Sequence, residues 1–143
     1  MLTYAYAAAL LLGIVAGLRT LTAPAVLLLV RHRSAAAYVL AVGALLEYAG
    51  DLYPKTPSRT GAAGLIARLA SGGFCGWVIT VPTGGSIALG VVLGLAGALV
   101  GAYGGLAVRV RAIDLIGRVP AALLEDAVAI AGAAVVVLML APA

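Results

Sequence analysis

The sequence contains little charge and few of the polar side chains that cover a soluble surface. Of its 143 residues only 10% are charged, and asparagine and glutamine are absent. An ordinary soluble domain has about 25% charged residues. Hydrophobic residues make up 64% of the chain, and the mean hydropathy is +1.19. This composition excludes a soluble globular domain and a disordered chain, and it predicts an integral membrane protein.

Cysteine and histidine each occur once, which excludes several kinds of chemistry. Cys75 lies in an apolar run, and His32 lies between two arginines. A single cysteine forms no intramolecular disulfide, and one cysteine with one histidine cannot complete a zinc site. A catalytic triad also requires a histidine beside its nucleophile. We therefore expect no metal and no cofactor, and the sequence argues against a hydrolytic-triad or redox enzyme.

The apolar stretches predict an all-α, polytopic transmembrane bundle in a single domain, residues 1–143. About 20 apolar residues are needed to cross a bilayer. About five segments are predicted, at residues 4–30, 34–53, 61–81, 87–108 and 120–140. The first is longer than one span and contains Arg19 and Pro24, so we expect it to kink or break between Leu18 and Pro24. Residues 109–118 are expected to form a basic loop.

The distribution of basic residues predicts the orientation of the bundle in the cell (inner or plasma) membrane. Cytoplasmic loops carry an excess of lysine and arginine. Five spans place Arg31 and Arg33 on one side and six basic residues on the other, with a cytoplasmic N-terminus. Those six are Lys55, Arg59, Arg68, Arg109, Arg111 and Arg118. If residues 61–81 re-enter the membrane without crossing it, the division is five to three and the N-terminus lies outside.

Two stripes of small residues predict close contacts between helices. The fourth segment has glycines spaced four, three, four and three residues apart: Gly90, Gly94, Gly97, Gly101 and Gly104. The first segment has a similar series: Gly13, Gly17, Thr20 and Pro24. Small residues let helices approach closely in a bilayer, where hiding leucine from lipid gains little. We expect both stripes to be contact faces, within one chain or between chains, and we favour a homo-oligomer, most simply a dimer.

Charged residues in or beside the apolar segments are the candidate solute- or ion-binding residues. They are Arg19, Glu47, Asp51, Arg59, Arg68, Glu125 and Asp126. Ionisable groups at membrane depth are costly unless they are paired or hydrated. One interpretation is that the acids pair with arginines and hold the bundle together. The other is a polar site near one membrane face, built from the broken first helix, the Glu47/Asp51 helix face and Glu125, because broken helices can line a cavity.

The loop at residues 54–60 is a second candidate site. It has two cations and three hydroxyls in seven residues, which favour phosphate, a lipid headgroup or a carboxylate. The candidate lipid- or anion-binding residues are Lys55, Ser58 and Arg59. The alternative is a plain cytoplasmic loop whose positive charge reflects topology alone.

Several motifs together resemble a known family. They are Gly17-Leu18-Arg19-Thr20, Glu47 followed by Asp51-Leu52-Tyr53-Pro54, Pro57-Ser58-Arg59-Thr60, Arg68, and Leu124-Glu125-Asp126-Ala127-Val128-Ala129-Ile130. Over nearly the whole chain this pattern resembles a family of small bacterial multi-pass membrane proteins catalogued as a domain of unknown function. The resemblance implies an architecture and no activity. The Asp-Lys-Leu-Pro of that family reads Asp-Leu-Tyr-Pro here, with Lys55 after the proline.

The same loop also resembles part of an enzyme family. The run from Pro54 to Gly61 is similar to the Pro-Gly-x-Ser-Arg-Ser-Gly loop of undecaprenyl-pyrophosphate phosphatases, which implies chemistry on a lipid phosphate. The present run has one extra residue, and the chain is shorter and lacks the Glu-rich motif of those enzymes.

These observations leave three hypotheses for the function. The leading one is a small oligomeric transporter or channel-like protein for a small or anionic solute. The second is an enzyme or binder of lipid phosphates or headgroups that uses the 54–60 loop. The third is a structural or accessory membrane protein whose charges only pair. In all three the partner is the lipid bilayer, and the basic excess is not expected to bind nucleic acid.

Overall fold

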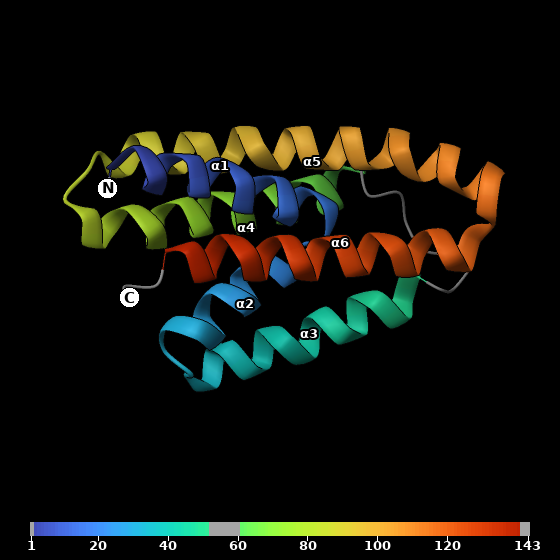
Figure 1. Ribbon diagram of the computed structural model, residues 1–143, viewed down its shortest axis with the longest axis horizontal. Helices are drawn as coiled ribbons and strands as arrows, with labels where there is room; N and C mark the ends of the chain where they lie inside the picture. Colours follow the sequence, from blue (N-terminus) through green and yellow to red (C-terminus); the bar gives the residue numbers. More distant parts are fainter. Residues whose placement is uncertain (1, 52–60, 141–143) are drawn as a thin grey trace.

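The computed structural model describes residues 2–51 and 61–140, and all regular elements within them are helices (Figure 1). The predicted all-α class is therefore confirmed for the described part of the chain. The helices are α1 (Leu2–Leu18), α2 (Thr22–Arg31), α3 (Ala35–Asp51), α4 (Ala62–Thr80), the short 3₁₀ turn η1 (Val81–Thr83), α5 (Ile87–Ile116) and α6 (Arg118–Met139).

The first apolar segment is broken, as predicted, and the chain also reverses there. Along α4, Gly17 lies beside Arg68, Thr20 beside Ser71 and Arg31 beside Val78, so α2 returns toward the end at which α1 begins (Figure 1). In an unbroken helix Pro24 would clash with the carbonyl of Thr20. In the first turn of α2 the same proline costs nothing, because the first amide groups of a helix have no partner inside it.

The reversal changes the predicted topology. Arg31 and Arg33 follow α2 at the same end of the bundle as the start of α1, where Tyr6 also contacts Ser86. The expectation that Arg31 and Arg33 lie on the opposite side from the N-terminal end of the first segment is therefore wrong. The physical reason is that the first segment forms a helical hairpin with a buried turn, and not one continuous span.

The predicted basic loop at residues 109–118 is also wrong. Helix α5 continues through this stretch to Ile116, and the chain turns at Gly117, whose φ of 86° suits glycine. Arginine is a good helix former. The charge of Arg109 is moreover matched by Glu125 on α6, so this stretch does not need to leave the helix.

The glycine stripes hold the centre of the bundle together. Helix α5 lies against α1 and α4, and a methyl group added at Gly97 or Gly101 would overlap backbone atoms of α1. At Gly94 it would overlap backbone atoms of α4. The predicted contact faces are therefore confirmed within one chain. Gly104 is an exception, since an added methyl group there would meet nothing within 4 Å.

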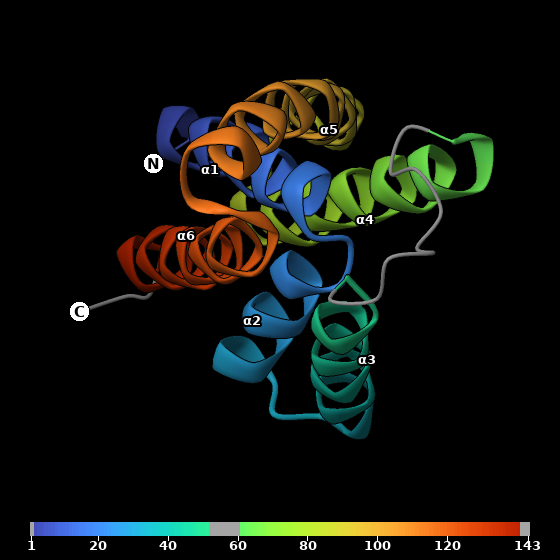
Figure 2. The same cartoon turned by 90° about the vertical axis from the view of Figure 1, so that its right-hand side faces the viewer.

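The remaining helices are arranged around this glycine-packed core (Figure 2). Helix α6 packs against α1, α2 and α5, while α3 lies at the periphery and packs mainly on α2. The apolar core that they enclose is built largely from alanine with a few larger side chains, among them Leu12, Leu27, Cys75 and Ile79.

Three helical stretches are long and apolar enough to cross a membrane: Ala62–Thr83, Ile87–Ile116 and Arg118–Met139. Helices α1, α2 and α3 are apolar but shorter. Many large apolar side chains point outward, including Val92, Val100, Val128 and Leu138. An apolar outer surface of this extent is typical of a membrane protein and would be a liability in water.

The glycine packing predicts different effects for two neighbouring substitutions. Gly101→Ala should lower the unfolding free energy by about 1–3 kcal/mol, because its methyl group would collide with the Ile14 carbonyl of α1. Gly104→Ala is the matched control in the same helix and should be neutral or slightly stabilising. Thermal unfolding of the purified protein in detergent, followed by circular dichroism, measures both. Equal melting temperatures for the two variants would contradict this packing.

Candidate functional site at the helix break

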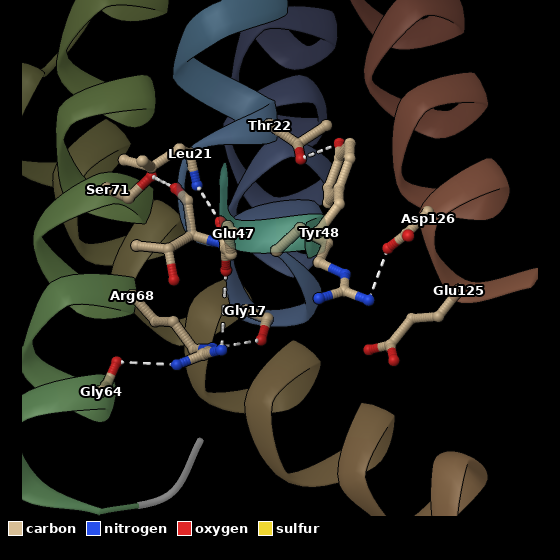
Figure 3. A network of polar contacts seen from close by, with 12 residues as sticks. Gly17, Leu21, Thr22, Glu47, Tyr48, Gly64, Arg68, Ser71, Glu125 and Asp126 are labelled. Carbon is tan, nitrogen blue, oxygen red and sulfur yellow. Dashed lines mark hydrogen bonds and ion pairs between the residues drawn. The ribbon is translucent and has the colours of Figure 1, made fainter. Parts of the chain in front are cut away.

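The break between α1 and α2 is bound by a carboxylate from α3. Glu47 accepts hydrogen bonds from the backbone N–H groups of Thr20, at 2.8 Å, and of Leu21, at 3.0 Å (Figure 3). These amide groups immediately precede α2 and have no partner within a helix. The positive end of the α2 dipole also favours a negative charge at this position. Glu47 therefore caps α2 from a distant part of the sequence.

The opposite side of the break is bound by α4. The buried Arg68 donates from Nε to the Gly17 carbonyl at 3.1 Å and from Nη1 to the Gly64 carbonyl at 3.0 Å. Its Nη2 lies 3.8 Å from Oε1 of Glu47. Ser71 donates to the Thr20 carbonyl at 2.5 Å. Arg68 and Ser71 thus satisfy carbonyl groups that the end of α1 would leave without partners.

Arg19 lies within the break and is 1% exposed. Its Nη2 lies 2.5 Å from Oδ1 of Asp126 on α6, and its guanidinium group lies 5.4 Å from the centre of the Tyr48 ring. The Tyr48 hydroxyl in turn shares a 2.5 Å hydrogen bond with Thr22 (Figure 3). An ion pair and a cation–π contact together hold this arginine in the interior.

A third ion pair lies next to Asp126 in the sequence. Glu125 accepts a hydrogen bond from Arg109 of α5 at 3.1 Å. Both residues line an otherwise apolar pocket of about 370 Å³ between α1, α5 and α6, and Leu18 and Gly104 line it as well. The lining of this pocket includes Glu125 but neither Arg19 nor Glu47, so it is not a shared cavity for the three predicted residues.

The structure brings together most of the predicted site residues that it describes. Arg19, Glu47, Arg68 and Asp126 form one network around the break, with Glu125 beside it. Asp51 is the last residue of α3, and its side chain lies outside the described part of the structure. The loop residues Lys55, Ser58 and Arg59 also lie outside the described residues.

Sequence reasoning did not find several members of the network. They are Thr22, Tyr48, Ser71 and Arg109. Hydroxyl groups inside apolar helices were the available signal for the first three, since a buried hydroxyl needs a partner. Arg109 was assigned to a loop, which concealed its pairing with Glu125.

The charge balance of the network determines what it can do chemically. Arg19, Arg68 and Arg109 each lie near a carboxylate, so the positive and negative groups offset one another. Within the described residues, no three His, Cys, Asp or Glu side chains lie close enough to hold a metal ion. The backbone amides at the break can hold an anion. In this structure the anion is the carboxylate of Glu47.

Comparison with known proteins adds no assignment. No family model matches the chain, and no curated protein or solved structure shows significant similarity to it. The resemblance to a family of small bacterial membrane proteins therefore stays a prediction.

The buried pair of Arg19 and Asp126 predicts non-additive effects. Arg19→Gln or Asp126→Asn alone should lower the unfolding free energy by about 3–5 kcal/mol, because each leaves an opposing charge in the interior. The double variant should recover much of that loss, since neither charge remains. Thermal unfolding in detergent gives the coupling, and Arg111→Gln at an exposed position is the control. Strictly additive losses would show that the two side chains do not depend on each other.

Proposed function

We propose that the protein is a small multi-pass membrane transporter for small anions, with its solute site at the break between α1 and α2. The observation that supports this proposal is the carboxylate of Glu47 on the amides of Thr20 and Leu21, with Arg68 3.8 Å away. The Glu47 carboxylate thus occupies a position formed by two backbone amides outside the helices and a guanidinium group. A solute carboxylate or phosphate offers the same oxygen atoms to the same donors.

The buried broken helix also favours a transport role. Irregular backbone at membrane depth is tolerated only where it is buried in protein or lines a cavity. In secondary transporters, half-helix ends bind anionic groups near the middle of the membrane. The α1–α2 hairpin has this form, because α2 begins inside the bundle at Thr22 and not at its end (Figure 1).

The position of α3 supplies a way to open the site. Glu47 is carried by this peripheral helix, which packs mainly on α2 (Figure 2). If α3 moves outward, the carboxylate leaves the two amides and an incoming anion can take its place. The solute then keeps the amides and Arg68 satisfied, so the exchange replaces one set of charge-assisted hydrogen bonds with another.

We further propose an orientation in the cell membrane. The connection between α5 and α6 lies at the opposite end of the bundle from the end of α2 (Figure 1). The first of these ends carries Arg109, Arg111 and Arg118, and the second carries Arg31 and Arg33. By the positive-inside rule, the excess of arginine at the α5–α6 end favours a cytoplasmic location for that end. The start of α1 and the end of α2, which lie at the same end of the bundle, are then on the outer side. A homodimer stays a prediction, for which chemical cross-linking in native membranes is the direct measurement.

A structural role is the second candidate, and the closed ion pairs favour it. Each of Glu47, Glu125 and Asp126 has an arginine partner. A purely structural network would bind these groups to each other permanently and move no solute. The lipid-phosphate hypothesis depends on the 54–60 loop, which lies outside the described residues, and stays a prediction.

Flux measurements test the transport proposal. The purified protein is reconstituted into liposomes, and uptake of phosphate, acetate and succinate is compared with protein-free vesicles. Wild type should transport at least one of these anions. Arg68→Gln should reduce its uptake by about tenfold or more, because a charge-assisted hydrogen bond of about 1.5–3 kcal/mol is lost. Glu47→Gln should change the uptake as well, because it removes the competing charge.

Controls separate transport from folding. Arg111→Gln, at an exposed position on α5, should transport like wild type. All variants are compared at equal amounts of folded protein, as judged by gel filtration. If the wild type transports an anion and both Arg68→Gln and Glu47→Gln transport it at the same rate, the proposed site is contradicted. Absence of flux together with lowered melting temperatures in these variants would favour the structural role.

A further inference from the structure

A second pocket lies away from the helix break, at the end of the bundle where α2, α4 and α6 finish. Its volume is about 720 Å³, within the range of roughly 300–1,000 Å³ typical of small-molecule sites. The walls are mostly apolar and include Leu28, Phe74, Trp77 and Val137. Arg31 and His32 are the polar lining residues among those described, so the pocket combines an apolar interior with a basic edge.

The basic edge is built into the end of α2. The backbone N–H groups of His32 and Arg33 both bond to the Leu28 carbonyl, at 2.9 and 3.0 Å, and close the helix. Arg33 adopts a left-handed conformation, with φ of 39°, where glycine usually ends a helix. Arg33 directly follows the lining residue His32 and therefore places a strained, positively charged residue beside the polar part of the lining. Strained backbone of this kind clusters at ligand-binding and switch regions of proteins.

The pocket is also bordered by residue types that gather near lipid headgroups. Arg31 ends an apolar helix, and its Nη1 lies 3.5 Å from the Val78 carbonyl near the end of α4. Trp77 is half-exposed beside it. Tryptophan and arginine gather at the boundary between the hydrocarbon core and the headgroups, where the apolar part of a side chain meets lipid and the polar part meets water.

We propose that this pocket binds an anionic phospholipid. An acyl chain lies against the apolar walls, and the phosphate group lies at Arg31, His32 and Arg33. Charge and polarity favour this occupant over others. Free phosphate has no apolar part to cover Phe74 and Val137, and a zwitterionic lipid offsets the arginine charges less completely. The proposal is independent of transport, because the pocket and the helix break have no residue in common.

Trp77 provides a direct measurement, because it is the only tryptophan in the chain. The protein is reconstituted into phosphatidylcholine vesicles that contain increasing fractions of phosphatidylglycerol with brominated acyl chains, which quench tryptophan at contact. A parallel series uses brominated phosphatidylcholine. We expect the anionic lipid to quench Trp77 at a severalfold lower mole fraction than the neutral lipid. Equal quenching curves for the two lipids would overturn the proposal.

Variants identify the residues responsible for the preference. The double variant Arg31→Gln/Arg33→Gln should bring the two quenching curves together, while Arg111→Gln, at the other end of the bundle, should keep the wild-type difference. Arg33→Gln alone should give an intermediate result, and its exposed side chain makes it the variant least prone to unfold. Retention of the full preference in the double variant would contradict a site at this edge. At constant ionic strength, millimolar inorganic phosphate should leave the preference intact, because free phosphate has no acyl chain to lie against the apolar walls. Loss of the preference under this condition would show that the acyl chain adds nothing to binding and would contradict the apolar pocket as the lipid site.

Discussion

The structure depends on satisfying the backbone where the first apolar segment breaks. A helix interrupted inside an apolar bundle leaves amides and carbonyls without partners, and each costs several kcal/mol in a medium without water. Here the amides of Thr20 and Leu21 are bound by Glu47, and the carbonyls of Gly17 and Thr20 by Arg68 and Ser71. Side chains of both α3 and α4 are thereby hydrogen-bonded to the turn at residues 19–21 between α1 and α2.

Glycine packing explains why these partners can reach the turn. Helices α1, α4 and α5 approach so closely that methyl groups do not fit between them at Gly13, Gly72 or Gly94. Close approach brings the α4 side chains within hydrogen-bonding distance of the α1 backbone. In lipid, where apolar side chains gain little by hiding from their solvent, such packing is a main source of helix association. The polar network is therefore a consequence of the small residues around it.

The short helix α2 links the two regions to which we assign function. Its first residues follow the carboxylate-bound break, and its last residue, Arg31, lies at the edge of the apolar pocket. A movement of α3 that releases Glu47 would also act on α2, because these two helices pack together. The proposed anion site and the proposed lipid pocket thus lie at opposite ends of one ten-residue helix and have no contact residue in common.

The sequence by itself determined the helical class, the apolar character, the break near Pro24 and the glycine contact faces. These features follow from composition, from the geometry of proline and from periodic spacing, which are local properties of a chain. The sequence also identified Arg19, Glu47, Arg68 and Asp126 as costly residues in need of partners. Only the tertiary structure decided which residues pair, that the chain reverses after α1, and that α5 continues past Arg109. Those outcomes depend on contacts between residues far apart in the chain, such as Glu47 with the amides of Thr20 and Leu21, and no local pattern encodes them.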